Sequence, residues 1–130
     1  MIARRAVLAA AAALPLLAAA PPTAVEEWTF LRSIDPDPAA LIAFIEANWF
    51  AMDRIAVARG LFSHFVLYRA DDADADWNVV VVVGYPDPRG YDGVREAFEA
   101  IRAAHRTVLI DGRDLKALGR ITGSRRVVRR

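Results

Sequence analysis

The chain has 130 residues, of which 55% are hydrophobic and 25% charged, a composition that supports one domain with a single core. It contains no cysteine, which excludes disulfide bonds, zinc-thiolate sites, iron-sulfur clusters and thiol catalysis. Removing residues 1–20 takes away two arginines and no acid, so 17 basic residues become 15 against 16 acidic ones. The resulting net charge of about −1 is a poor basis for binding nucleic acid, and no such partner is predicted.

The N-terminal segment is typical of a signal peptide. Arg4 and Arg5 precede an apolar run from Ala6 to Ala20 that ends in small residues. This run is shorter than the about 20 residues that a membrane span needs. We therefore predict export to the periplasm or the medium without stable membrane insertion, by an ordinary secretory or a twin-arginine route, with a retained anchor as the alternative. The predicted organisation is a signal peptide over 1–20, cut near Ala19, Ala20 or Ala24, then a linker over 21–27 and a domain over 28–130.

The first two predicted elements of the domain are a strand and a long helix. Residues of β-favouring types alternate from Trp28 to Ile34, which predicts a strand. Asp37 is a good N-cap and Pro38 suits the first helical position, so we expect a helix from Pro38 to Arg59 that ends at Gly60. Its apolar stripe is expected to face a sheet. Its solvent side is expected to carry Glu46, Asp53 and Arg54.

A strand with no polar face, Trp77 to Tyr85, dominates the second half of the chain. It follows a predicted strand over Leu61–Arg69 and an aspartate-rich hairpin loop over 71–76. Successive side chains of a strand point to opposite faces, so the valines of this segment cover both. Leaving Val80 and Val82 in water would forfeit about 1.5 kcal/mol each. With the helices expected on one face, a second molecule is predicted to cover the other.

The remaining elements are two helices and a strand. A loop rich in proline and glycine, 84–93, leads into a helix that should start near Tyr91 or Asp92 and extend to about Ile110. A strand over 107–110 is the alternative for the end of this segment. We then expect a short helix over Asp114–Leu118 and a last strand near Ser124–Arg129.

The predicted order, βαββαβ, is that of an α+β ferredoxin-like fold, a four-stranded antiparallel sheet with two helices on one face. The element order, the all-valine strand and the long loop after it resemble the dimeric α/β barrel superfamily. That superfamily includes antibiotic-biosynthesis monooxygenases, haem-degrading enzymes and stress-response barrel proteins. The resemblance implies that the other face of the sheet packs against a second copy in a homodimer, and it supports function only by analogy.

Four side chains on the first two strands are candidates for chemistry. His64 and Tyr68 share one face of the second strand, and Arg32 and Trp28 share a facing position on the first. A histidine beside a phenol and a guanidinium can orient a phenolic or carboxylate ligand and move a proton near neutral pH. In this interpretation His64 is the proton acceptor, Tyr68 and Arg32 orient the substrate and Trp28 stacks on it. The alternative is that His64 and Tyr68 are packing residues with locally satisfied polar atoms.

Two further aromatic residues are candidates for ligand binding, Trp49 on the first helix and His105 on the second. Trp49 is equally explained as a core residue, and His105 as a histidine at a helix end. The haem-degrading members of the superfamily use a helix histidine with strand tryptophan and asparagine residues, but the order and spacing here do not match. No haem, other cofactor or metal site is predicted. The alternating aspartates of the hairpin loop lack the glycine and glutamate of a calcium loop.

The predicted function is that of an exported homodimer that binds a small, partly aromatic molecule in its barrel or its helix–sheet cavity. One alternative is a cofactor-free monooxygenase-like enzyme or isomerase that uses His64. A second is a structural or stress-associated protein without a ligand, in which Trp28, Trp49 and Phe62 fill the cavity themselves.

Overall fold

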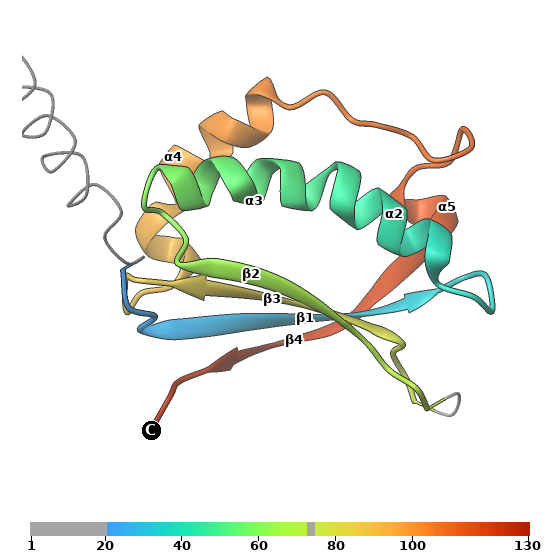
Figure 1. Cartoon of the computed structure of the whole chain (residues 1–130), viewed down its shortest axis with the longest axis horizontal. Coiled ribbons are helices and arrows are strands. Elements are labelled where there is room, and N and C mark those ends of the chain that lie inside the picture. The colour runs from blue at the N-terminus through green and yellow to red at the C-terminus, as the bar shows by residue number, and fades with distance from the viewer. Residues whose placement is uncertain (1–20, 73–74) are drawn as a thin grey trace, which may run out of the picture.

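The computed structural model describes residues 21–72 and 75–130, so the predicted signal peptide lies outside the described residues. The chain alternates strands and helices in the order expected from the sequence (Figure 1). The strands are β1 (Val25–Ser33), β2 (His64–Arg69), β3 (Val79–Tyr85) and β4 (Gly119–Val127). The helices are α2 (Ala39–Ala47), α3 (Trp49–Ala58), α4 (Tyr91–Ala104) and α5 (Leu115–Leu118). None of these helices is both long and apolar enough to cross a membrane.

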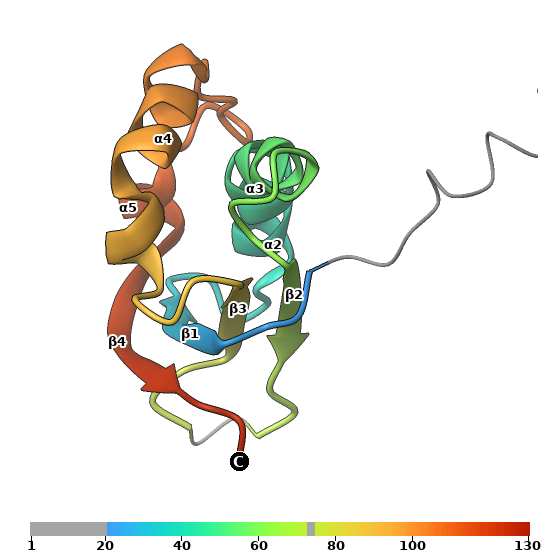
Figure 2. The ribbon, with the colours of Figure 1, turned by 90° about the vertical axis from the view of Figure 1, so that its left-hand side faces the viewer.

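The strands form one antiparallel sheet in the order β2-β3-β1-β4. The all-valine strand β3 is central, with Phe30 of β1 and Tyr68 of β2 lying opposite Val80 on its two sides. The helices lie over one face of the sheet, and no helix or strand of the described part covers the other (Figures 1 and 2). The predicted α+β ferredoxin-like arrangement, with its helices on one face, is therefore confirmed. We call the face without helices the open face.

The central strand is buried on both faces, but not in the way predicted. Val79 and Val81 pack into the core under the helices, as expected for one face of a strand. On the open face, Val80 and Val82 are each only 2% exposed within a single chain. The register places Phe30 and Tyr68 on the two sides of Val80, and Trp28 and Val66 on the two sides of Val82. The sheet therefore covers these valines itself, and their burial does not require a second molecule.

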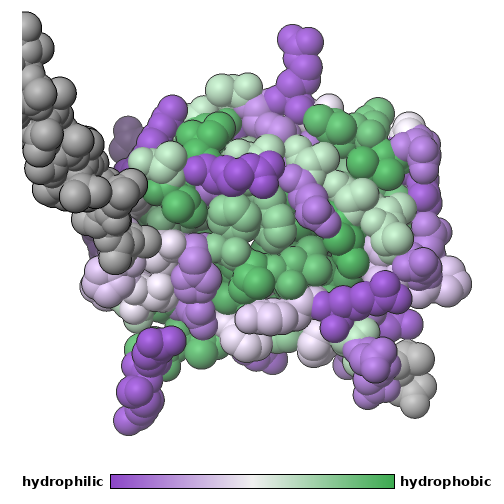
Figure 3. All heavy atoms as spheres, viewed as in Figure 1, coloured by the Kyte–Doolittle hydropathy of each residue, from purple (hydrophilic) through white to green (hydrophobic). Residues whose placement is uncertain are grey.

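The helix predicted from Pro38 to Arg59 consists of two segments that meet at Asn48. The backbone N–H of Asn48 donates to the carbonyl of Phe44 at 3.0 Å, and the N–H of Met52 donates to that of Asn48 at 3.2 Å. Helical hydrogen bonds thus continue across the junction, and α2 and α3 follow one another as a single rod (Figure 1). Hydrophobic residues gather over this rod and between it and the sheet (Figure 3).

The second long helix is shorter than predicted. α4 begins at Tyr91 as expected, but it ends at Ala104 instead of near Ile110. Asn48 holds the following segment, because its side-chain amide donates to the carbonyl of Val108 at 2.8 Å and its Oδ1 accepts from the N–H of Val108 at 2.7 Å. A side chain that satisfies both backbone groups of one residue replaces the hydrogen bonds that a longer helix would supply. α5 then follows as predicted, and β4 starts directly after it, earlier than expected.

Candidate functional site

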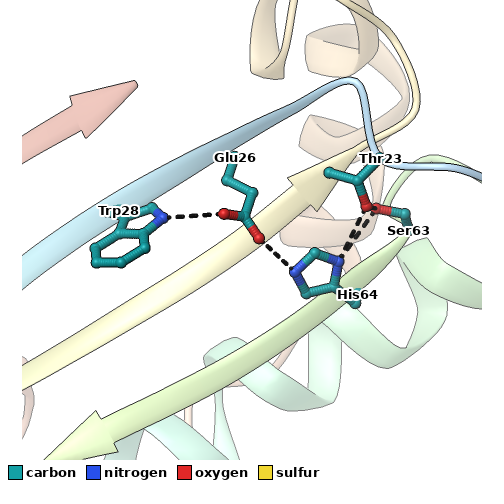
Figure 4. A network of polar contacts seen from close by, with 5 residues as sticks. All are labelled: Thr23, Glu26, Trp28, Ser63 and His64. Atoms are coloured by element: carbon teal, nitrogen blue, oxygen red, sulfur yellow. Dashed lines mark hydrogen bonds and ion pairs between the residues drawn. The ribbon is translucent and has the colours of Figure 1, made fainter. Parts of the chain in front are cut away.

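The first candidate residue, His64, lies at the start of β2 on the open face, within a network of polar side chains (Figure 4). Its Nε2 is 2.9 Å from Oε2 of Glu26 on β1. Its Nδ1 lies 3.2 Å from the hydroxyl of Thr23 and 3.3 Å from that of Ser63. The other oxygen of Glu26 accepts from the indole N–H of Trp28 at 3.3 Å.

This network selects the tautomer of the neutral imidazole. A carboxylate can only accept, so in neutral His64 the Nε2 carries the proton and Nδ1 is the acceptor for a hydroxyl. The ring lies above Gly84, where an added Cβ would be 2.3 Å from Cε1 of His64. A pocket of about 520 Å³ opens beside the network, with Thr23, Glu26 and His64 in its wall. The arrangement can orient a histidine as a proton acceptor, and it also explains His64 as a locally satisfied residue.

The residues expected to work with His64 are spread along the open face. Tyr68 shares that face as predicted and is 54% exposed, but it lies four residues further along β2. Arg32 lies six residues further along β1 than Glu26, the partner of His64, which is a separation of about 20 Å at the rise of a strand. Its guanidinium donates to the carbonyl of Ala75 at 3.1 Å. Only Trp28 therefore reaches the His64 network.

The two predicted ligand-binding residues on the helices lie on the other side of the sheet. Trp49 is the first residue of α3 and lines a pocket between the helices and the sheet. His105 follows the last residue of α4, and its Nε2 is 2.9 Å from Oδ1 of Asn48. His105 thus helps to hold the segment after α4, which is a structural contact.

The pocket beside Trp49 has a volume of about 370 Å³. Its floor is the helix-covered face of β1 and β3, and its walls come from α3, α4 and α5. Three of its aromatic side chains form a contiguous cluster, since the Phe62 ring is 4.9 Å from that of Phe98 and 5.0 Å from that of Tyr85. The lining residues are Thr29, Trp49, Met52, Asp53, Phe62, Val81, Val83, Tyr85, Tyr91, Phe98, Arg102, Leu115 and Ile121.

A carboxyl group, that of Asp53 on α3, lies in the wall of this pocket. Asp53 was predicted on the solvent side of its helix, but that prediction is wrong, because the residue is only 5% exposed. Burial raises the pKa of Asp53 from 3.8 to about 7, although the charge of Arg54 lowers it. The group is therefore a mixture of acid and carboxylate near neutral pH. It can accept or donate a proton there.

A second acid, Glu27, lies beside the pocket, where α4 begins. Its Oε2 accepts from the backbone N–H of Tyr91 at 2.7 Å, so Glu27 caps the helix from β1. Burial raises the pKa of the Tyr85 phenol above its usual range, and the negative charges of Glu27 and Asp53 raise it further. A hydrogen bond to Glu27 contributes to the same shift, so Tyr85 stays protonated.

The sequence contained one signal for Asp53. It stands four residues after Trp49 and three before Ala56, which places it on the apolar stripe of the predicted helix. The charge of Asp53 favours the solvent side of the helix, whereas its spacing favours the buried side. Within the described part of the chain, no three histidine, aspartate or glutamate side chains are arranged to hold a metal ion.

Comparisons with known proteins bear on the fold. No protein-family model matches the chain, and no curated protein does. Among solved structures, the chain is similar to the crystal structure of HapK from Hahella chejuensis, with a TM-score of 0.52 and 16% sequence identity. The match covers 81% of this chain and 91% of HapK. At this identity the similarity supports the ferredoxin-like α+β fold and assigns no activity.

Proposed function

We propose that the protein is an exported homodimer of the dimeric α/β barrel type that binds a small, partly aromatic molecule between its sheet and its helices. The observation that carries the binding part is the pocket of about 370 Å³ walled by Trp49, Phe62, Tyr85, Tyr91 and Phe98. The export part rests on the N-terminal sequence. The dimer part rests on the superfamily resemblance and on the composition of the open face.

The size and lining of the pocket fit a small ring compound. Ligand pockets typically have volumes of about 300 to 1,000 Å³ and consist of apolar and aromatic walls with a few polar groups. Here the polar groups are those of Thr29, Asp53, Arg102 and the tyrosines. In a protein without a ligand, Trp28, Trp49 and Phe62 were expected to fill the space. Trp28 lies on the open face, and a volume of about 370 Å³ remains beside Trp49 and the buried Phe62, which favours the binding function.

The structure gives less support to an enzyme in which His64 and Arg32 act on the same substrate. His64 and Arg32 are separated by about 20 Å along the sheet, so they cannot both contact one small ring. Neither of them lines the pocket under the helices. An enzymatic reaction in that pocket would depend on Asp53 as its proton acceptor.

Neutral ring compounds test the binding function. We expect 4-methylphenol and indole to bind the mature protein in isothermal titration calorimetry, and Thr29→Phe to weaken both by about tenfold or more, because the added ring occupies the pocket floor. Thr107→Phe, which adds the same ring on the exposed segment after α4, should leave binding unchanged. The proposed function is wrong if neither compound binds, or if Thr29→Phe folds and binds them as the unmodified protein does.

The homodimer is proposed to form through the open face. Trp28, Phe30 and Trp77 form a row of aromatic rings on this side, with centroid distances of 6.4 and 5.1 Å. Tyr68 is 54% exposed on the same face. Two sheets that pack face to face would bury these side chains in a shared core about 10 Å thick. The aromatic side chains of the open face are therefore the reason to expect a partner. Val80 and Val82 are not, because they are already covered within one chain.

Sedimentation equilibrium over a dilution series tests the dimer. The unmodified protein is expected to sediment as a dimer, and Phe30→Glu to convert it to a monomer, because a carboxylate in the shared core would be desolvated without a partner. Ile55→Glu changes a residue on α3 that is 43% exposed, and it should leave the dimer intact. A monomeric unmodified protein at every concentration contradicts this part of the proposal.

A further inference from the structure

We propose that the pocket under the helices selects aromatic molecules that carry a protonated amine, with the Asp53 carboxylate as the counter-charge. This inference rests on the proposed function, since it specifies the class of ligand that the same pocket binds. The pocket is expected to prefer cationic ligands over neutral and anionic ones, and Asp53 is the residue that causes this preference.

Asp53 is buried without a hydrogen-bonding or ion-pair partner from the described part of the protein. It is only 5% exposed, and within residues 21–72 and 75–130 its side chain makes no hydrogen bond or ion pair. In the same ranges, no fully buried side-chain oxygen lacks a hydrogen-bond partner, so the Asp53 oxygens must reach the space of the pocket that they line. Buried carboxylates are nearly always paired or hydrogen-bonded. The missing partner is therefore expected from a molecule in the pocket.

The aromatic walls of the pocket also favour a cation. The faces of tryptophan and tyrosine rings attract cations, and the effect is larger where water is excluded. Trp49, Tyr85 and Tyr91 line the pocket together with Asp53. An ammonium group in this space would thus meet a carboxylate and aromatic rings at once, while the ring of the ligand packs on Phe62 and Phe98.

The other charged side chains near the pocket favour a ligand cation over a ligand carboxylate. Glu27 lies close enough to Tyr85 to raise its pKa, so a second negative group stands beside a tyrosine of the pocket wall. Three arginines stand nearby, and all are exposed. Arg95 lies over the ring of Tyr91, 5.0 Å from its centroid, and forms an ion pair with Asp92. Arg54 is the chain neighbour of Asp53, and Arg102, at the pocket wall, lies 3.7 Å from Glu99 in an exposed ion pair. A ligand carboxylate would meet Arg102 at the exposed part of the wall, whereas a ligand cation would meet the buried Asp53.

Three ring compounds that differ in charge test this selectivity. Tyramine carries an amine, 4-methylphenol is neutral and 4-hydroxyphenylacetate carries a carboxylate. In calorimetry at about pH 8, where Asp53 is mostly ionised, we expect tyramine to bind about tenfold or more tightly than 4-methylphenol, and 4-hydroxyphenylacetate to bind most weakly. Tyramine should also lose affinity as the pH falls below about 7, because Asp53 takes up a proton.

Asp53→Asn keeps the shape of the side chain and removes its charge. The variant should bind tyramine no better than 4-methylphenol. Glu46→Gln removes an exposed carboxylate from the same helical rod and should retain the tyramine preference. A folded Asp53→Asn that still prefers tyramine overturns the inference.

The two proposals fail in different ways. If the unmodified protein binds 4-methylphenol and does not prefer tyramine, the charge selectivity is wrong and the proposed function stands. If none of the three compounds binds, both are wrong. Should Asp53→Asn not fold, the pH dependence of tyramine binding to the unmodified protein decides, since an affinity that does not change between about pH 6 and pH 8 contradicts a role for Asp53.

Discussion

Asp53→Asn is expected to make the protein more stable at and above neutral pH. The pKa of Asp53 is about 7 in the folded protein and near 3.8 when the chain is unfolded. Between these values the folded state holds a proton that the unfolded state has lost, so stability falls as the pH rises, by about 1.4 kcal/mol per pH unit. The total penalty above pH 7 is about 4 kcal/mol as an upper limit. An uncharged asparagine does not carry this penalty.

Urea unfolding at a series of pH values measures this effect. The unmodified protein should lose stability from about pH 4 to about pH 7, and the difference between it and Asp53→Asn should grow over the same window. Glu46→Gln serves as the control, because Glu46 is an exposed carboxylate on α2, and this variant should retain the pH-dependent loss. A constant difference between Asp53→Asn and the unmodified protein across the window would show that Asp53 ionises freely in the folded state.

Leu31→Ala is expected to lower the free energy of unfolding by about 2 to 5 kcal/mol. Leu31 is 0% exposed and lies on β1, where it packs in one cluster with Leu41, Ile45 and Leu118 from the helices above. Removing its side chain loses the transfer free energy of the buried methyl groups and leaves a cavity that this packed cluster can only partly fill. A loss of this size is a large part of the roughly 5 to 15 kcal/mol that stabilises a domain.

The urea midpoint, with the slope of the transition unchanged, measures this loss. Ile34→Ala is the matched control, because Ile34 follows β1 directly and is 61% exposed. It should shift the stability by about 0.5 kcal/mol or less. Equal effects of the two substitutions would show that Leu31 is not at the centre of the core.

The two faces of the sheet carry different chemistry. The helix-covered face ends in a pocket with a buried acid and aromatic walls, whereas the open face carries an aromatic row and the His64 network. We propose that the helix-covered face binds the ligand and that the open face binds the second copy. Substitutions on one face should therefore leave the function of the other intact, as the variants at Thr29 and Phe30 test.

The sequence by itself determined the order and type of the elements, because their signals are local. Asp37 accepts from the N–H of Ala39 at 3.0 Å at the start of α2, and Gly60 follows α3 with a φ of 75°, as their residue types predict. Asp114 caps α5 in the same way. The valine run is a strand, since β-branched residues favour an extended chain. From this order the ferredoxin-like fold follows, because few topologies accommodate it.

Only the tertiary structure decided how distant residues meet. α4 ends at Ala104 because Asn48, which is 60 residues from Val108, binds the chain there. His64 pairs with Glu26, 38 residues away, because the sheet register places both beside Gly84. Asp53 is buried because α4 and the sheet close around a helix face that carries it. Periodicity predicts which side of an element is apolar, but the contacts that bury a charge or end a helix depend on packing between segments far apart in the chain.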